Sequence, residues 1–555
     1  MAYPVESLNL ALTNLSQRHP ESWQLSACGV TPGLIQIPAL LHQAAYAPEY
    51  QHTRVLLLAG LAGRAADTRL ALRALESPLI QQSHQNGPDW SAIPCANPEG
   101  QRDLSRGYPP EGQFFNHPEE PEKRYLWRWI CFQAPGLVLE LREGASVRWQ
   151  SNAAASDLAA KLGASRIINN GGSLLVALGQ VTPDNLGTIP GLRLTTPPDQ
   201  LAAQLARLGR VLDGELVVSP ARQALDARRA RTPKAVAGIL AGVYGYRLDS
   251  PINYTQAVGI SGRLRFHELA PETESPAPSI VNLVAPYASG QTPPHGDQPS
   301  GSNLAGLIWG TELTEATGDS RYTDMVIAAA NHYQPGAGDA APPPCDPDFR
   351  CEDLFTGGAM LGRAYHLTGE RRYLDLLVKL LLDGHIQQPD GLFWHCRSAA
   401  YRWSRANGFA ALGLTETLTY LPEDFSHRDK ILEMYRHLLD GMLSVQHPSG
   451  MFNQLLDYPG SYQELTATSM MVYALARGLR LGWLDSSYRP ALERTWQAVS
   501  EHVDDAGNVV DGCASTGVQQ SVKEYLDRPA IQGYDDRTGG MALWCAVEQA
   551  RLVGQ

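Results

Sequence analysis

The sequence predicts a multidomain protein in which an N-terminal α/β domain is followed by an all-α toroid of paired helices. The chain has 555 residues, too many for one hydrophobic core, so we expect at least two domains. Strand-like and helix-like patterns alternate up to about residue 235, as they do in an α/β sheet domain. From about residue 301 the pattern is almost purely helical and repeats itself.

Composition indicates an ordinary globular protein and excludes several kinds of partner. Hydrophobic residues make up 43% and charged residues 18% of the chain, as in soluble proteins. The formal net charge of −12 argues against nucleic acid and anionic membranes as partners. No apolar stretch is long enough for a membrane helix, and the opening MAYPVESLNLALTNL has no basic region ahead of an apolar run, so we expect no signal peptide.

The cysteines favour a cytoplasmic protein. Eight are scattered along the chain without a CxxC pair, a pattern typical of reduced, partly buried thiols. A bond between Cys345 and Cys351 in an oxidising compartment is the alternative.

The α/β domain is predicted over residues 1–235. Residues 53–63, TRVLLLAGLAG, have the pattern of a buried strand that ends in a glycine turn. Residues 67–77, DTRLALRALES, have that of an amphipathic helix. Residues 135–144 and 171–179 are predicted as two further strands.

Residues 236–300 are rich in Pro, Gly and Ser, and we expect a linker and entry loops there. Residues 262–269, GRLRFHEL, could form a strand within them. A loop region of this length usually has a function or connects two domains.

The toroid is predicted over residues 301–555. The pattern of residues 313–332 recurs in residues 364–385: a helix, a T-G-acid turn, and R-Y-x-D at the start of the next helix. Gly318 and Gly369 fit the C-cap position of the first helix in each copy. Repeated helical hairpins stack on one another, and pairs that close into a ring form an (α/α) toroid whose loops line a central cleft.

Polar and aromatic residues gather in segments between the predicted helices. The candidates for catalysis or sugar binding are Asp297, Glu352, Asp353, Trp394, His395, Trp403, Arg405, Asn407 and Glu464. Each has an ordinary structural alternative, as a turn residue, a helix cap or part of the core. If these segments converge, they make a sugar site, because aromatic faces stack on sugars and Arg binds a carboxylate. A carboxylic acid among aromatic rings also has a raised pKa and can act as a general acid.

The order of several motifs resembles the unsaturated glucuronyl and galacturonyl hydrolases, which are glycoside hydrolase families 88 and 105. WSRANGF at residues 403–409 is the strongest element and is similar to the W-x-R-G-N-G-W box of those families. EDLFTGGAML at residues 352–361 comes next, and ELTATSMM at residues 464–471 is a looser match. Ala406 and Phe409 stand where the families have Gly and Trp.

The resemblance implies a hydrolase that acts on small oligosaccharides ending in an unsaturated uronate and needs no cofactor or metal. In those families an acid donates a proton to C4 of the 4,5-unsaturated ring, water adds at C5, and the hemiketal opens. The acid maps to Glu352 or Asp353, and we favour Asp353 for its residue type. Asp297 lies at a plausible distance for a second family Asp. The substrate-contacting box maps to His395, Trp403, Arg405 and Asn407.

The first domain resembles the M14 zinc carboxypeptidases over roughly residues 20–190. The resemblance rests on VLLLAGLAGRAADTRLALRAL, IPCANPEGQ and PGLVLELREG. The three positions that hold zinc ligands in that family are Ala62, Ala65 and Arg142 here, and none can bind zinc as a His or a carboxylate does. We therefore expect a carboxypeptidase-like scaffold without a metal.

Two other functions stay open on the residues alone. One is another toroid enzyme, either an epimerase or an ordinary glycosidase. An epimerase would need two His residues on facing helices, and the helical half shows no obvious pair. The other is an inactive glycan-binding protein, which would tolerate loss of Asp353 without losing affinity. The particular uronate and the oligomeric state are not predicted.

Overall fold

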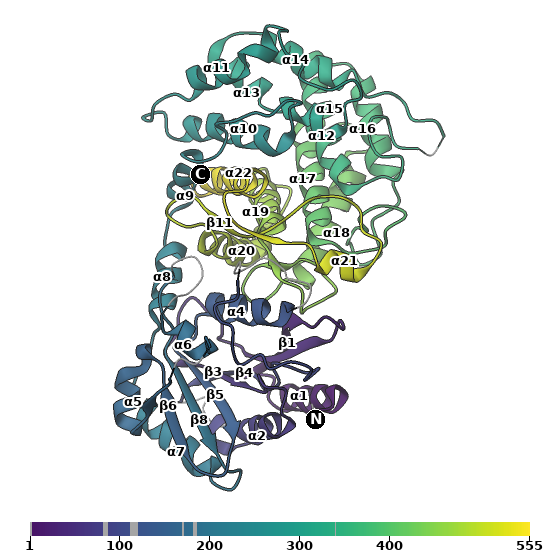
Figure 1. The fold of residues 1–555 in the computed structure, drawn as a ribbon. Coiled ribbons are helices and arrows are strands. Elements are labelled where there is room, and N and C mark those ends of the chain that lie inside the picture. Colours follow the sequence, from purple (N-terminus) through teal and green to yellow (C-terminus); the bar gives the residue numbers. More distant parts are fainter. Residues whose placement is uncertain are drawn as a thin grey trace. The chain divides into compact units, whose positions relative to one another are not determined.

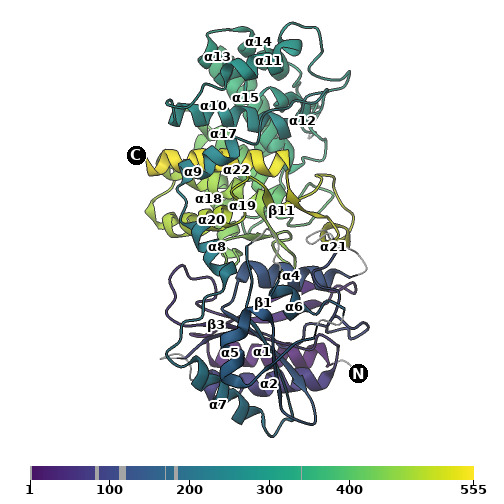
Figure 2. The same ribbon diagram turned by 60° about the vertical axis from the view of Figure 1, so that its left-hand side comes forward.

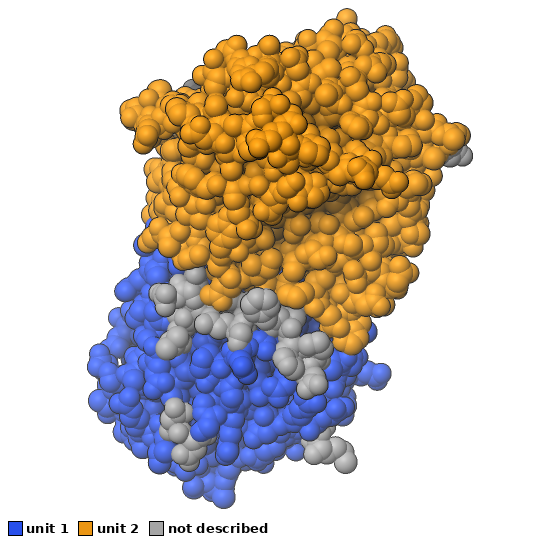
Figure 3. Space-filling model, turned by 45° about the horizontal axis from the view of Figure 1, so that its top comes forward, with its two compact units in different colours: residues 1–228, 458–462 blue, residues 229–457, 463–555 orange. Residues whose placement is uncertain are grey.

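The structure is a computed structural model that describes residues 3–81, 87–111, 120–168, 171–180, 186–338 and 340–554. The chain forms two compact units (Figure 3). The α/β unit comprises residues 1–228 and 458–462, and the helical unit comprises residues 229–457 and 463–555. Among the described residues no helix is long and apolar enough to cross a membrane, and the eight cysteines are buried free thiols.

The α/β unit is built on an eight-stranded mixed sheet with the order β1-β2-β4-β3-β5-β8-β6-β7. The strands are β1 (Trp23–Val30), β2 (Gln36–His42), β3 (Arg54–Ala59), β4 (Asp89–Ile93), β5 (Leu137–Glu143), β6 (Arg148–Ser151), β7 (Ser165–Arg166) and β8 (Gly191–Thr196). The four central strands, β4, β3, β5 and β8, run parallel. Strands β3 and β5 confirm the two strands predicted at residues 53–63 and 135–144.

Helices cover both faces of this sheet, with α1, α2 and α7 on one face and α4 and α6 on the other (Figures 1 and 2). The helices of the unit are α1 (Val5–Arg18), α2 (Ala65–Leu75), α3 (Pro78–Gln81), α4 (Pro121–Gln133), α5 (Ser156–Leu162), α6 (Leu174–Leu178), α7 (Leu201–Leu212) and α8 (Pro220–Arg229). Leucines at helical spacing on α1 and α7, such as Leu8, Leu12, Leu205 and Leu208, are fully buried against the sheet. Helix α2 confirms the helix predicted at residues 67–77.

The strand predicted at residues 171–179 is wrong, because Leu174–Leu178 form the short helix α6. Ser173 caps this helix by accepting a hydrogen bond from the Val176 amide. All five residues of α6 are buried. A short apolar run does not distinguish a buried strand from a buried helical turn.

The helical unit begins earlier than predicted, since residues 236–300 contain helices as well as loops. The helices in and beside this segment are α9 (Pro233–Ala241), α10 (Tyr254–Leu269) and α11 (Ala277–Ala288). The strand considered at residues 262–269 is wrong, because these residues complete α10. Helix α10 is buried almost all round, so it lacks the one-sided pattern of a surface helix. Its glycines permit close packing: a Cβ on Gly259 would lie 2.8 Å from the Gly245 nitrogen.

Five long helices and one short segment form a closed inner ring, in the order α10, α22, α19, α17, α15 and α12–η4. These elements are α22 (Asp536–Val553), α19 (Leu465–Arg480), α17 (Ser404–Tyr420), α15 (Cys351–Thr368), α12 (Gly301–Leu304) and η4 (Ala305–Leu307). Neighbouring long helices run in the same direction. Thr466 meets Thr538 near the start of α19 and α22, for example, and Arg477 meets Glu548 near their ends. The predicted toroid is therefore present, with the N-termini of its inner helices at one end.

An outer layer packs around this ring and completes the helix pairs (Figure 1). Its helices are α9, α11, α14 (Arg321–Ala330), α16 (Arg372–Leu382), α18 (Arg428–Ser444) and α20 (Arg489–Glu501), with α21 (Val522–Leu526) in a connecting segment. Helix α13 (Gly310–Thr317) continues the short inner segment α12–η4, and its Glu312 faces the ring, where it pairs with Arg265 on α10 and Arg363 on α15. Two short sheets lie in the connections: β9 (Phe452–Asn453) with β10 (Gln463–Glu464), and β11 (Val509–Cys513) with β12 (Ala530–Gly533). The repeated hairpin is confirmed, because Gly318 and Gly369 cap α13 and α15 in the left-handed conformation.

Aromatic side chains fill the middle of the barrel. Phe355 packs against Tyr254, Phe409 and Trp544, with ring centroids 5.8 to 6.1 Å apart. Tyr473 stacks on Trp544 at 5.4 Å. The toroid therefore has a packed core below its N-terminal end.

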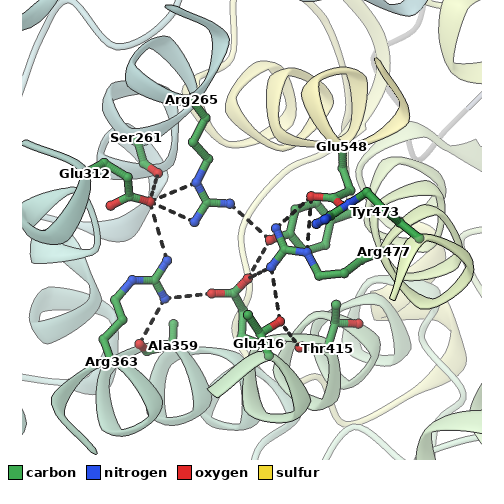
Figure 4. A network of polar contacts seen from close by, with 12 residues as sticks. Ser261, Arg265, Glu312, Ala359, Arg363, Thr415, Glu416, Tyr473, Arg477 and Glu548 are labelled. Atoms are coloured by element: carbon green, nitrogen blue, oxygen red, sulfur yellow. Dashed lines mark hydrogen bonds and ion pairs between the residues drawn. The ribbon is translucent and has the colours of Figure 1, made fainter. Parts of the chain in front are cut away.

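Buried ion pairs close the other end of the barrel (Figure 4). Glu416 on α17 accepts hydrogen bonds from Arg363 at 2.7 Å and from Arg477 at 3.0 Å. Glu312 on α13 pairs with Arg265 at 2.8 Å, and Glu548 on α22 pairs with Arg477 at 2.7 Å. The charges of Arg363, Arg477 and Arg265 outweigh the effect of burial and lower the pKa of Glu416 to about 2. We call these residues the basal ion network.

Candidate active site

The adjacent acids Glu352 and Asp353 occupy the first turn of α15, where the helix dipole favours negative charge. Both are largely buried, at 6% and 9% exposure, which normally disfavours the ionised form of a carboxyl group. The two side chains have different neighbours, and their pKa values move in opposite directions.

Glu352 is held as a carboxylate by its neighbours. His395 Nε2 lies 3.1 Å from Glu352 Oε1, and His395 Nδ1 lies 2.5 Å from the hydroxyl of Tyr525. Arg350, the residue before α15, has its Nη2 3.5 Å from the same carboxylate oxygen. Burial raises the pKa of Glu352, but the charge and hydrogen bond of His395 and the charge of Arg350 together outweigh it, and the pKa falls to about 2.

Asp353 has the opposite environment. Its Oδ2 accepts one hydrogen bond, from the amide of Asp346 at 2.8 Å. Its other oxygen faces α12, where a Cβ on Gly301 would lie only 2.8 Å from Oδ1. Burial, reinforced by the negative charge of Glu352, raises the pKa of Asp353 to about 7 in spite of the Asp346 amide and Arg350. Asp353 can therefore hold a proton near neutral pH.

Trp403 forms a wall beside this acid pair. Its side chain is fully buried, and its ring centroid lies 4.8 Å from that of His395 and 5.9 Å from that of Tyr525. Two cations stack on it, with Arg405 and Arg528 each 4.6 Å from the ring centroid. The tryptophan thus fixes the imidazole that pairs with Glu352.

Three of the predicted binding residues act here as supports. Arg405 is fully buried and donates a hydrogen bond to the Cys513 carbonyl at the end of β11. Glu464 accepts from the Cys513 amide at 3.0 Å while it caps α19. Asn407 accepts from the Phe393 amide at 2.7 Å and donates to the Phe393 carbonyl at 3.0 Å. Together they hold β11 and the segment around Phe393 against α17 and α19.

The remaining two predicted residues lie at the edge of this cluster or apart from it. Trp394 is half-buried, and its carbonyl accepts a hydrogen bond from the Cys351 thiol at 3.1 Å. Asp297 is exposed in the loop before α12. No contact in the described part of the chain joins Asp297 to the acid pair.

Four residues around the acid pair are not predicted from the sequence: Arg350, Asp346, Tyr525 and Arg528. Tyr525 lies in the polar segment DGCASTGVQQSVKEYL between α20 and α22, far along the chain from the histidine it meets. The polar and aromatic composition of that segment was the available signal. Arg350 directly precedes α15 and stands two residues before Glu352, and its side chain remains partly exposed.

In the α/β unit, the positions that match zinc ligands hold other side chains. Ala62 lies in the turn after β3, and Ala65 begins α2. Arg142 on β5 donates to Glu140 at 2.5 Å, and Glu140 also pairs with Arg193 on β8 at 2.9 Å. Within the described residues no cluster of three His, Cys, Asp or Glu side chains could hold a metal ion.

The helical architecture has solved counterparts among glycoside hydrolases. A family 105 glycoside hydrolase from C. acetobutylicum aligns with a TM-score of 0.51 and 17% identity, over 57% of this chain and 99% of that one. A possible family 105 member from Klebsiella pneumoniae aligns with a TM-score of 0.50 and 19% identity, over 60% of this chain and 93% of that one. At this level of identity the similarity shows the toroid fold alone.

A sequence match is more specific. Residues 351–553 match the model of Glycosyl Hydrolase Family 88. This family 88 segment begins at Cys351, the first residue of α15, and contains all the candidate residues except Asp297. The C-terminal part of the resemblance is thereby supported, whereas the carboxypeptidase-like part stays a prediction.

Curated relatives match part of the chain, and their names differ. An unsaturated 3S-rhamnoglycuronyl hydrolase of Formosa agariphila is 30% identical over 180 residues, which is 29% of this chain and 48% of the relative. The unsaturated rhamnogalacturonyl hydrolase YesR of Bacillus subtilis is 29% identical over 143 residues, which is 25% of this chain and 39% of the relative. The chain thus spans about half or less of the length of these relatives.

Proposed function

We propose that the helical unit is a glycoside hydrolase that removes a terminal unsaturated uronate from small oligosaccharides by hydration of its 4,5 double bond. The observation that carries the proposal is the difference in pKa between the two acids, about 7 for Asp353 and about 2 for Glu352. Such a pair supplies a proton donor and a permanent negative charge side by side at neutral pH. The family 88 segment and the names of the relatives agree with this chemistry.

In the proposed reaction the Asp353 carboxylic acid donates its proton to C4 of the enol ether, and positive charge develops at C5 and the ring oxygen. Water bonds to C5 and returns a proton to the Asp353 carboxylate, so the side chain ends in its starting state. The resulting hemiketal opens, the C1–oxygen bond breaks, and the remaining sugar leaves as an alcohol. Glu352 stays ionised and stabilises the positive charge of the intermediate.

We propose Arg350 as the group that meets the uronate carboxylate. It is the partly exposed cation that acts on both acids, and a guanidinium binds a carboxylate in a bidentate manner. The N-termini of the inner helices lie at the same end of the barrel and add further positive potential. The half-buried ring of Trp394 would provide the aromatic face for a sugar.

The test is a panel of unsaturated disaccharides released by lyases from pectin, glycosaminoglycan, ulvan and alginate. Turnover is followed as the loss of ultraviolet absorbance of the conjugated double bond. We expect at least one member to be consumed at a rate that depends on Asp353. If the enzyme consumes none of them, or releases sugars only from saturated substrates, the hydration chemistry is wrong.

For the α/β unit we propose a carboxypeptidase-like scaffold that no longer has a metal site. The parallel centre of its mixed sheet and the replacement of the ligand positions by Ala62, Ala65 and Arg142 support this proposal. Arg142, near the end of β5, pairs with Glu140 and stands where the carboxypeptidases have their third ligand. Such a unit would act as a structural partner for the hydrolase.

A further inference from the structure

We propose that a hollow beside the C-terminal half of α10 is a second sugar site, which binds a uronate without turning it over. The hollow has a volume of about 430 Å³ and is formed by α9, the end of α10 and the segment that leads into α11. This volume lies within the usual range of small-molecule sites. No residue of the candidate active site lines it, so its function is separate from the proposed hydrolysis.

Arg263 supplies a buried cation whose charge is not balanced by the protein. It is 6% exposed and lines the hollow. Its two terminal nitrogens donate to neutral oxygens, the Gly245 carbonyl and the Ser279 hydroxyl, each at 2.9 Å. In the described part of the chain no carboxylate lies within ion-pair distance of it, and burial lowers the pKa of Arg263. Because each terminal nitrogen carries two N–H groups, donors remain for a ligand carboxylate.

Tyr246 supplies an aromatic face next to this cation. It is 53% exposed and lines the hollow, so its ring is accessible to a ligand. The guanidinium carbon of Arg263 lies 3.7 Å from the ring centroid. Exposed aromatic rings beside donor groups suit a sugar, whose C–H faces stack on the ring while its hydroxyls form hydrogen bonds.

Polar side chains in the wall of the hollow can form hydrogen bonds with the hydroxyls of a sugar. The hydroxyls of Thr273 and Ser275 line it, and His267 contacts the Thr273 hydroxyl through Nδ1 at 3.2 Å. Glu274 also lines the hollow but is exposed and forms no ion pair with Arg263 among the described residues. The combination of one unbalanced guanidinium, one aromatic face and several hydroxyls fits a sugar with a single carboxylate better than a neutral sugar.

Calorimetric titration of the full chain with D-glucuronate tests the proposal, with D-glucose and acetate as comparison ligands. We expect glucuronate to bind at least tenfold more tightly than either. Tyr246→Ala and Arg263→Met should each weaken this binding at least tenfold, and Tyr246→Ala alters an exposed side chain, so folding is preserved. Tyr534→Ala is the matched control, because Tyr534 is 46% exposed and has Arg247 at 5.5 Å from its ring but does not line the hollow.

The outcomes separate this site from the hydrolase activity. If the candidate active site also binds glucuronate, the wild-type chain binds two molecules of it, and Tyr246→Ala and Arg263→Met should each bind only one. Wild-type affinity in both variants overturns the proposal, as does equal affinity for glucose. If acetate binds as tightly as glucuronate, the hollow recognises only a carboxylate, and the proposal that it binds a sugar is wrong. Because no turnover is measured, failure of the proposed hydrolysis does not affect the result.

Discussion

At the scale of the residue, the main feature is that two neighbouring acids on one helical turn are driven apart in pKa by different partners. Successive side chains of a helix point in different directions, so Glu352 reaches His395 and Arg350 while Asp353 meets the Asp346 amide and Gly301. Burial raises the pKa of Asp353, and the negative charge of Glu352 raises it further. The function of one side chain thus depends on the ionisation of the other.

The first prediction concerns substitution of the two acids. Asp353→Asn removes the group that donates a proton to C4 in the proposed mechanism, so turnover of an unsaturated disaccharide should fall at least a thousandfold, a barrier increase of about 4 kcal/mol. Glu352→Gln leaves the donor in place and should have a milder effect. Rates are measured by loss of absorbance, with circular dichroism as the check on folding. The reverse order of the two effects would assign the proton donor to Glu352.

The second prediction concerns pH. The reaction needs the protonated form of Asp353, whose pKa is about 7, so kcat/KM should be constant below this pH and fall above it. Glu352→Gln removes a charge that raises this pKa, and the fall should then begin at lower pH. A pH–rate profile of both proteins measures the shift. An unchanged profile in the variant would show that the two acids are not coupled.

The third prediction concerns Arg405. The structure makes it a positioning residue, since its guanidinium stacks on Trp403 and binds the Cys513 carbonyl. Arg405→Lys keeps the charge but loses the planar stack, and kcat/KM should fall at least tenfold, by roughly 1.4 kcal/mol. Arg402→Lys is the control, because Arg402 directly precedes Trp403 in the sequence but forms a partly exposed ion pair with Asp390. Equal effects of the two variants would remove the positioning role.

The sequence identified which residues gather at the site but not what each one does there. Of the residues that the motifs singled out, Glu352, Asp353, His395 and Trp403 lie close together in the structure, and their roles stay predictions. The motif order could not show that Arg405 is fully buried or that His395 meets Tyr525. These facts depend on loops that are distant in sequence and meet only when the ring of helices closes.

At the scale of the element, the basal ion network joins α10, α13, α15, α17, α19 and α22 near the C-terminal ends of the inner helices. Each buried charge there depends on its partners, because a buried ion that loses its counter-ion is strongly unfavourable. Exposed ion pairs on the outer helices contribute little by comparison.

The fourth prediction follows from this contrast. Arg363 is fully buried and contacts both Glu312 and Glu416. Arg363→Met leaves these carboxylates partly uncompensated and should destabilise the helical unit by about 3–5 kcal/mol. Arg371→Met removes an exposed ion pair with Asp375 and should leave the melting temperature unchanged. Thermal unfolding by calorimetry compares the two, and equal melting temperatures would show that the network does not stabilise the fold.

Sequence patterns predicted the elements well where one face of a helix is apolar and poorly where an element is buried on all sides. The repeated hairpins of α13 to α16 have both a pattern and glycine caps. Helix α10 and helix α6 have neither an exposed face nor a clear period, and the sequence predicts loops or strands in their place. The difference arises because hydrophobic periodicity reports an interface between core and solvent.

At the scale of the whole molecule, the two units differ in how far the sequence explains them. Part of the helical unit matches a family model, whereas the carboxypeptidase-like prediction for the α/β unit is based on short motifs and on its sheet. It is also discontinuous, since residues 458–462 belong to it: Tyr458 donates to the Leu34 carbonyl at 2.6 Å, and the Gly460 amide donates to Gln36 at 2.8 Å. A local sequence pattern cannot predict that a segment from the middle of one unit packs in the other.

The cytoplasmic location likewise stays a prediction.

The fifth prediction is that the purified full chain contains no stoichiometric zinc in its α/β unit. Ala62 and Ala65 have no donor atoms, and the Arg142 guanidinium cannot act as a ligand. Elemental analysis after dialysis against zinc should give well under one metal per chain. One tightly held zinc that survives Asp353→Asn and Glu352→Gln would contradict the carboxypeptidase-like reading of these positions.

The parallel orientation of the inner helices has an evolutionary consequence. The N-terminal end of the ring carries the loops and the acid pair, while the opposite end carries the basal ion network and the aromatic core lies between them. If the proposed function holds, substitutions in the loops would change which sugar is accepted without weakening the contacts that hold the ring closed. A barrel of this kind can diversify its substrates while its stability is conserved, and relatives acting on different uronates should differ mainly at one end.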